Sequence, residues 1–237
     1  MTGKVAIVTG GTSGMGEATA QELVKRGWQV AAMARSKSAF QGDVAEDADC
    51  RRVAKAVLDK WGRIDALVNN AGTTKFVKHD DLEGLSADDI LGIFRVNFVG
   101  PWQMIRACAP ALKASRGSIV NISSVAAVLG TGSSIAYAAS KAALETMSIS
   151  LARALGPEIR VNVVAPGYVK TPWQVSAHGQ AGADDLEQKY ASVAPLRTAV
   201  GAEDVAGTVA WLLEGAPRLT GDIIYVDAGM HIASPRR

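Results

Sequence analysis

A chain of 237 residues, 48% hydrophobic and 20% charged, can bury a large core, which excludes a disordered protein. The formal net charge of +2, with acids and bases interspersed, argues against a surface for nucleic acid or an anionic membrane. Two cysteines, Cys50 and Cys108, are too few for a disulfide framework or a zinc cluster, so we expect a reducing environment and no metal site.

The length suits one α/β domain over residues 1–237. No apolar run approaches about 18 residues, and a strand pattern follows almost directly on Met1. We therefore expect a cytoplasmic protein with neither a membrane span nor a signal peptide.

The chain begins with a predicted strand, a glycine-rich turn and a helix. The strand covers residues 5–9, the turn is Gly10-Gly-Thr-Ser-Gly-Met-Gly16, and the helix covers residues 17–25. Glycines let the backbone approach a pyrophosphate, and a helix N-terminus offers unpaired N–H groups. The spacing is G-x-x-x-G-x-G, which differs from the general G-x-G-x-x-G fingerprint. A phosphate-binding turn is the interpretation we favour, and a tight turn without a ligand is the alternative.

The second predicted strand, residues 29–34, ends next to a cation. Arg35 follows it, and no Asp or Glu occurs between Val30 and Gln41. In dinucleotide-binding folds an Asp or Glu at this place hydrogen-bonds the ribose 2′-hydroxyl of NAD, whereas an Arg accommodates the 2′-phosphate of NADP. The sequence therefore favours NADP over NAD. Residues 36–41 are too few for a full crossover helix. Asp43 would then lie beside the adenine with Val44, or would instead cap the helix predicted over 47–61.

The middle of the chain contributes two polar features. A strand over 64–68 is closed by Asn69-Asn-Ala-Gly72, whose small residues allow close approach to a ligand. A long apolar helical stretch over 91–114 contains Asn97, a residue with poor helix propensity. A kink around Gly100-Pro101 would explain Asn97 structurally, and a carbonyl that anchors a water near Lys141 would explain it functionally.

Ser124, Tyr137 and Lys141 are the candidates for chemistry. Ser124 ends a strand over 117–122, where its hydroxyl either holds a substrate carbonyl oxygen or caps the strand. Tyr137 and Lys141 lie one turn apart on a predicted helix that runs to residue 155. A nearby cation favours the phenolate, so this pair could transfer a proton near pH 7. The alternative is an ordinary surface pair.

The last third of the chain adds one more strand-to-turn junction. A strand over 159–164 leads into Ala165-Pro-Gly-Tyr-Val-Lys-Thr171, whose backbone groups could meet a nicotinamide carboxamide. The residues of this turn that we assign to cofactor binding are Pro166, Gly167, Val169 and Thr171. Residues 172–195 are weakly periodic and are interpreted as an irregular lid over the substrate. A helix over 202–213 and a strand over 221–226 complete the pattern.

Six motifs occur in register along nearly the whole chain: Thr9-Gly-Gly-Thr-Ser-Gly-Met-Gly16, Asn69-Asn-Ala-Gly72, Asn97, Ser124, Tyr137-x-x-x-Lys141 and Pro166-Gly167. Together they resemble the short-chain dehydrogenase/reductase family. The resemblance implies an α/β fold with a single Rossmann-type, doubly wound parallel sheet of about seven strands and helices on both faces. It also implies a homotetramer or homodimer.

The resemblance implies a role for each matched residue. Tyr137 would be the general acid/base, Ser124 would hold the substrate oxygen, and Lys141 would lower the tyrosine pKa and bind the nicotinamide ribose. Asn97 would complete a proton relay through water. The residues implied to surround the cofactor are Gly10, Thr12, Ser13, Gly14, Met15, Gly16, Asp43, Val44, Asn70, Ala71, Gly72, Tyr137 and Lys141.

The implied activity is hydride transfer between NADP(H) and a carbonyl or secondary alcohol, for example a 3-oxoacyl compound or a small ketone. Ser13 departs from the family pattern, because many NADP-dependent members carry a basic residue at this position. The NADP prediction therefore depends on Arg35. The alternatives are an NAD-dependent alcohol dehydrogenase of the same fold and a non-catalytic dinucleotide-binding member. The residues do not name the substrate.

Overall fold

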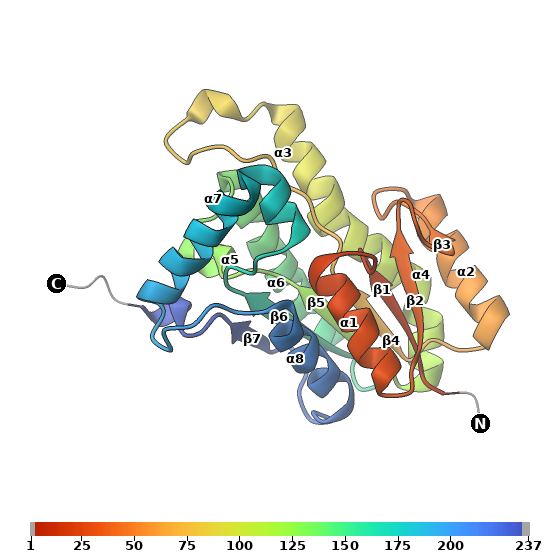
Figure 1. The fold of residues 1–237 in the computed structure, drawn as a ribbon. Coiled ribbons are helices and arrows are strands. Elements are labelled where there is room, and N and C mark those ends of the chain that lie inside the picture. Colours follow the sequence, from red (N-terminus) through yellow and green to blue (C-terminus); the bar gives the residue numbers. More distant parts are fainter. Residues whose placement is uncertain (1–2, 234–237) are drawn as a thin grey trace.

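Seven parallel strands form a single sheet in the computed structural model, which describes residues 3–233 (Figure 1). Their order is β3-β2-β1-β4-β5-β6-β7. The bounds are β1 Val5–Thr9, β2 Gln29–Ala34, β3 Phe40–Gln41, β4 Ala66–Asn69, β5 Ser118–Ile122, β6 Arg160–Pro166 and β7 Ile223–Val226. The predicted sheet is confirmed; of the predicted domain, residues 1–2 and 234–237 lie outside the described part.

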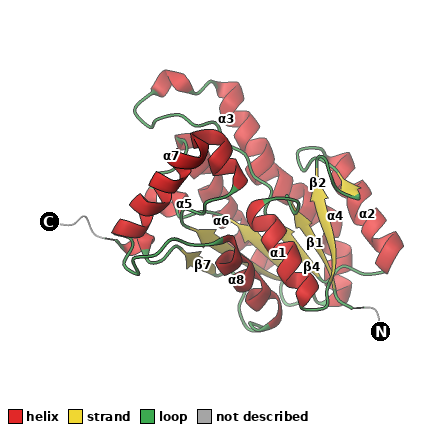
Figure 2. Cartoon of the chain, viewed as in Figure 1, coloured by secondary structure: helices red, strands yellow, loops and turns green. Residues whose placement is uncertain are grey.

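Helices cover both faces of this sheet (Figure 2). Helices α1 (Gly14–Lys25) and α8 (Ala202–Glu214) pack on one face, and α2 (Asp47–Trp61), α4 (Gly100–Ser115) and α6 (Ile135–Leu155) pack on the other. Successive side chains of a strand point to opposite faces. In β1, accordingly, Val5 and Ile7 join the core under α2 and α4, and Val8 joins the core under α1 and α8.

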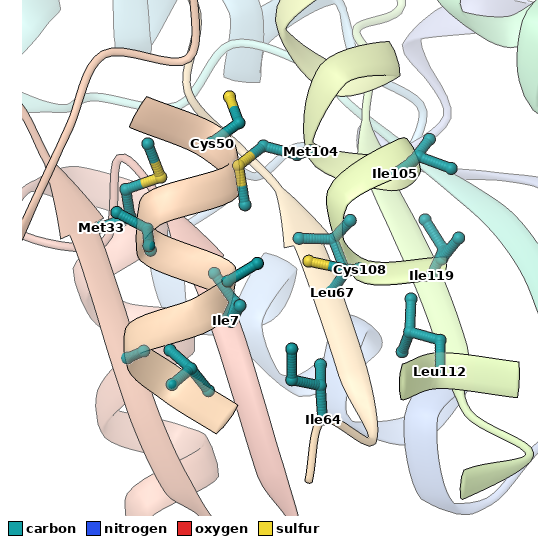
Figure 3. Packing of buried hydrophobic residues seen from close by; sticks show 14 of the residues in the cluster. Ile7, Met33, Cys50, Ile64, Leu67, Met104, Ile105, Cys108, Leu112 and Ile119 are labelled. Atoms are coloured by element: carbon teal, nitrogen blue, oxygen red, sulfur yellow. The ribbon is translucent and has the colours of Figure 1, made fainter. Parts of the chain in front are cut away.

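Both cysteines belong to the core between the sheet, α2 and α4 (Figure 3). Cys50 and Cys108 are fully buried, and Met33, Met104 and Ile7 are among their neighbours in the cluster. Burial raises the pKa of each thiol to about 12. They therefore stay protonated near neutral pH and act as small apolar side chains.

The segment after β2 contains no helix. Strand β3 follows after a few residues and pairs in parallel with β2, with Met33 opposite Phe40 and Ala34 opposite Gln41. This agrees with a chain segment too short for a crossover helix. Asp43 does not cap α2, because the N-cap of that helix is Glu46. The Asp43 carboxylate instead accepts a hydrogen bond from Ala45 N at 2.9 Å.

The long helix predicted over 91–114 is interrupted at a different place than expected. Helix α3 (Ala87–Phe94) leads into a π-helical turn, Arg95–Val99, and α4 follows without a break. Gly100 and Pro101 themselves continue as helix, and the irregularity is the π-helical turn directly before them, where Pro101 has no N–H to offer the preceding turn. The irregularity lies at Asn97, inside the π-helical turn.

Residues 172–195 are not an irregular segment. They form α7 (Pro172–Val193), bent at Gly179, which has a φ of +71°. The prediction failed because α7 rests on the edge of the molecule and only Ala183 is fully buried, so it needs no continuous apolar stripe. The remaining short elements are the helix α5 (Ala126–Leu129) and two 3₁₀ turns, η1 (Leu82–Gly84) and η3 (Met230–Ile232).

Candidate active site

A cavity of about 440 Å³ opens at the carboxyl ends of β1, β2 and β4, where the strand order reverses. Open α/β sheets bind ligands at this point. The predicted cofactor residues that line it are Gly10, Thr12, Ser13, Gly14, Met15, Arg35, Asp43, Val44, Asn70, Ala71, Gly72, Tyr137, Lys141 and Thr171. The fold thus brings most of the predicted cofactor residues together.

The glycine-rich turn has the shape of a phosphate cradle. Gly10 and Gly14 adopt φ values of +63° and +53°, a region that favours glycine, and a Cβ on Gly14 would meet Thr171 at 3.2 Å. Within the described residues, no side chain caps the N-terminus of α1 at Ser13, and Gly14 and Met15 of its first turn line the cavity. Asn70 Nδ2 donates to the carbonyls of Thr9 and Gly10 at 3.0 and 3.3 Å and fixes the turn. These features fit a pyrophosphate.

Gly16 supports the cradle from behind and does not line the cavity. A Cβ there would overlap the Gly10 carbonyl oxygen and Asn70 Nδ2. The prediction that Gly16 contacts the cofactor is therefore replaced by a packing role. It allows the close approach of α1 to the turn.

We expect Gly16→Ala to lower the free energy of unfolding by about 1–3 kcal/mol, because the methyl group must displace the turn. Denaturant unfolding measures this change. Gly207→Ala on α8 is the matched control: no described atom lies within 4 Å of its Cβ position, so it should stabilise by up to about 1 kcal/mol. Equal stability of wild type and Gly16→Ala would contradict the packing role.

Arg35 marks the far end of the cavity. It is exposed directly after β2 and, among the described residues, forms no ion pair. Asp43 and Val44 line the same end. The guanidinium is thus available to an anionic ligand.

A second cavity, of about 640 Å³, meets the first one at Tyr137. Residues that line both are Met15, Ser123, Tyr137, Thr171 and Trp173. Ser124 lines only the second cavity. Three residues that we expected beside the nicotinamide also line only the second cavity: Pro166, Gly167 and Val169. The turn after β6 that contains them is held against β7, because Gly167 N donates a hydrogen bond to Val226 O at 2.9 Å.

Tyr137 and Lys141 both lie on helix α6, next to the junction of the two cavities. The Ser134 hydroxyl caps the helix by accepting a hydrogen bond from Tyr137 N at 3.2 Å. Lys141 is only 4% exposed, and its Nζ donates to the Ile122 carbonyl at 2.8 Å. The same Nζ lies 5.7 Å from the centre of the Tyr137 ring. Lys141 is therefore buried and Tyr137 half-buried, which excludes an ordinary surface pair.

The pKa values of this pair differ from the expectation. Burial raises the pKa of Tyr137 to about 12, and a hydrogen bond with Ser124 only partly offsets this. Burial lowers the pKa of Lys141 to about 8, against the opposing charge of Glu145. Desolvation is thus the largest influence on the Tyr137 pKa in this structure, and the lowering of that pKa by Lys141 stays a prediction. Tyr137 is therefore a protonated hydroxyl at neutral pH.

Asn97 is fully buried and lines neither cavity. Its Oδ1 accepts from Thr73 N at 2.8 Å, and its Nδ2 donates to Thr73 O at 2.9 Å and to Ser140 Oγ at 3.0 Å. The side chain thus ties the loop after β4 to α6. This accounts for an Asn in an apolar helix, and it places Asn97 beside the helix turn that carries Lys141.

Comparisons with known proteins agree with this geometry. The family model described as Enoyl-(Acyl carrier protein) reductase matches residues 10–231. The 3-oxoacyl-[acyl-carrier-protein] reductase FabG of Escherichia coli is 32% identical over 247 residues, which cover 97% of this chain and 98% of the relative. A Streptomyces violaceoruber protein named as ketoacyl reductase 2 of the granaticin polyketide synthase is 37% identical over 243 residues, 96% of each chain.

Solved structures match as well. A Burkholderia xenovorans protein classed as a short-chain dehydrogenase/reductase has a TM-score of 0.88 and 35% identity, with 97% of this chain and 98% of that chain covered. The Thermoplasma acidophilum aldohexose dehydrogenase has a TM-score of 0.93 and 30% identity, with 99% and 96% covered. This chain belongs to the short-chain dehydrogenase/reductase family. It is an oxidoreductase by family.

Glu145 is a residue of this short-chain dehydrogenase/reductase that sequence reasoning missed. It lies one helical turn after Lys141, is 9% exposed, and accepts a hydrogen bond from Ser123 Oγ at 2.7 Å. Burial raises the pKa of its carboxyl, while Ser123 and Lys141 lower it. An acid four positions after Lys141 in an apolar helix was the available signal.

We expect Glu145→Gln to shift the alkaline limb of the pH–rate profile to lower pH. The carboxylate raises the pKa of Lys141, so its neutralisation lets Lys141 lose its proton at a lower pH than about 8. Gln keeps an acceptor for Ser123, so the fold should persist. The measurement is kcat/KM against pH, with exposed Glu83→Gln as control. An unmoved limb would show that Glu145 only packs.

The lowered pKa of Lys141 also makes the free energy of unfolding depend on pH. The pKa of Lys141 falls from an ordinary 10.5 to about 8 on folding. Between these values the unfolded chain binds more protons, so the contribution of Lys141 to stability rises with pH across that window and is lost below it.

The described residues, 3–233, show two further properties of this short-chain dehydrogenase/reductase. None of their helices has the length and apolarity of a membrane span. Nor do they contain a group of three or more His, Cys, Asp or Glu side chains placed to hold a metal ion.

Proposed function

We propose that this protein is an NADP-dependent ketoreductase that interconverts a carbonyl compound, of the 3-oxoacyl or small-ketone kind, and its secondary alcohol. The observation that carries the proposal is the junction of two cavities at Tyr137. Lys141 lines one of them and Ser124 the other. A cofactor site and a substrate site thus share the residue that can transfer a proton.

Each residue at the junction has a distinct task. Ser124 and Tyr137 hold the substrate oxygen, and Tyr137, protonated at neutral pH, donates its proton to it. Lys141 is a buried cation that stabilises negative charge on the tyrosine oxygen after the transfer. Asn97 holds the Thr73 loop and Ser140, and we propose that it also supports a water-mediated proton relay to Lys141. The bound nicotinamide supplies the hydride.

The NADP preference is supported by Arg35. A guanidinium can bind a 2′-phosphate bidentately, and no carboxylate at Ala34 repels it. The names of two relatives, a FabG 3-oxoacyl reductase and a ketoacyl reductase, support the carbonyl substrate. An NAD-dependent alcohol dehydrogenase remains the alternative to be tested.

We further propose that α7 acts as a lid, because its Trp173 lines both cavities. We expect a cytoplasmic homodimer or homotetramer, which light scattering on the purified protein would test.

A substrate screen that follows NADPH and NADH absorbance tests the function. The proposal expects oxidation of NADPH with a subset of ketones, faster than oxidation of NADH. If the protein binds nicotinamide dinucleotides but turns over no carbonyl or alcohol, it is a non-catalytic family member.

A further inference from the structure

The second cavity is lined by aromatic rings from four segments: the loop after β4, α6, the turn after β6, and α7. Trp173 stands edge-on to the Tyr137 ring at 6.2 Å and to Phe76 at 6.0 Å. Tyr168 and Tyr190 stack at 5.1 Å on the α7 side. Phe76 and Trp173 are each 38% exposed, so part of each ring is free to contact a ligand. Such walls favour a planar, apolar ligand body.

The charges of this cavity are all of one sign. Lys78 and Lys189 line it, and no Asp or Glu among the described residues does. Neither lysine forms an ion pair within residues 3–233. Two nearby lysines behave differently, because Lys75 pairs with Asp89 at 2.8 Å and Lys170 with Asp184 at 3.2 Å. The lining therefore carries two exposed lysines without an ion-pair partner among the described residues, whereas the acids Asp184 and Glu187 next to the cavity are both bound to Lys170.

The volume decides the size of the ligand. About 640 Å³ is in the range of pockets that hold drug-sized molecules, and it exceeds what a small aliphatic ketone fills. The hydroxyls of Ser124 and Tyr137, which suit a carbonyl oxygen, belong to the lining of this cavity. The aromatic walls and the two lysines remain for the rest of the molecule.

We propose that the substrate is an aromatic keto acid: a ketone with an aromatic body that packs against Trp173 and Phe76 and a carboxylate that binds Lys78 and Lys189. The proposal deepens, and rests on, the proposed ketoreductase function. The lysines contribute to ground-state binding and take no part in the chemistry, so they act on KM and leave kcat unchanged.

Calorimetry on the cofactor-free protein tests binding without depending on turnover. The probes are a fused-ring aryl keto acid, its methyl ester, and an aliphatic keto acid of the same length. The keto acid should bind about tenfold tighter than both others. Lys78→Gln and Lys189→Gln should each weaken it by about three- to tenfold, while the ester is unaffected. Lys25→Gln, an exposed lysine at the far end of α1, is the control and should change nothing.

Three results would overturn the inference: equal affinity for acid and ester, equal affinity for the aromatic and aliphatic acids, or lysine variants that bind like wild type. Tight binding of a ketone linked to phosphopantetheine, with none of the free keto acid, would also overturn it and indicate a carrier-bound substrate. If the keto acid binds as expected but is not reduced with NADPH or NADH, the binding inference stands and the ketoreductase function fails.

Discussion

Replacement of Tyr137 by Phe is expected to lower turnover by about a hundred- to ten-thousandfold and to leave NADPH binding nearly unchanged. The change removes only the hydroxyl. The ring keeps its edge-on contact with Trp173, and Lys141 keeps its hydrogen bond to Ile122. In the proposed mechanism this hydroxyl donates its proton to the substrate oxygen, and it lines the same cavity as Ser124. Turnover and the dissociation constant of NADPH are to be measured on the same preparations.

Tyr225→Phe is the matched control, since it removes a phenolic hydroxyl from β7, outside the residues that line the two cavities. It should retain wild-type turnover. Near-wild-type turnover of Tyr137→Phe would remove the tyrosine from the chemistry, and a large loss of NADPH binding would mean that the hydroxyl serves the cofactor.

Replacement of Arg35 by Ala should weaken NADPH binding by about ten- to a hundredfold and leave NADH binding almost unchanged. A charge-assisted hydrogen bond contributes roughly 1.5–3 kcal/mol, which corresponds to this range. Ala34→Asp should shift the preference toward NADH, because Ala34 lines the same end of the cavity and a carboxylate there repels a 2′-phosphate. Both dissociation constants must be measured at one ionic strength, because salt screens an exposed ion pair.

Lys37→Gln controls for general charge, because Lys37 is an exposed cation that does not line the cavity. It should change neither constant appreciably. If Arg35→Ala weakens NADPH and NADH equally, or if the wild type prefers NADH, Arg35 is an ordinary loop cation and the NADP assignment fails.

Much of the fold and most of the site could be predicted because their signals are local. A β-branched run, a glycine-rich turn and a helix in direct succession determine the cradle at Gly10 and Gly14. The one-turn spacing of Tyr137 and Lys141 places them on one side of α6 whatever that helix packs against. The short segment after β2 excluded a crossover helix by length alone.

Other features depended on what each residue packs against. A weakly patterned segment forms α7, a helix of which only Ala183 is fully buried and which therefore needs no continuous apolar stripe. The turn after β6 carries Gly167 into the second cavity because β7 holds it there.

The amino-acid sequence by itself thus determined which groups are candidates for the chemistry, since residue type and spacing along a helix or turn are local properties. Only the tertiary structure decided how buried these groups are and how their pKa values shift. Burial, which no spacing reveals, raises the pKa of Tyr137, lowers that of Lys141 and encloses Glu145 beside it. These shifts follow from desolvation by strands and helices distant in the sequence, which only the packed sheet brings around α6.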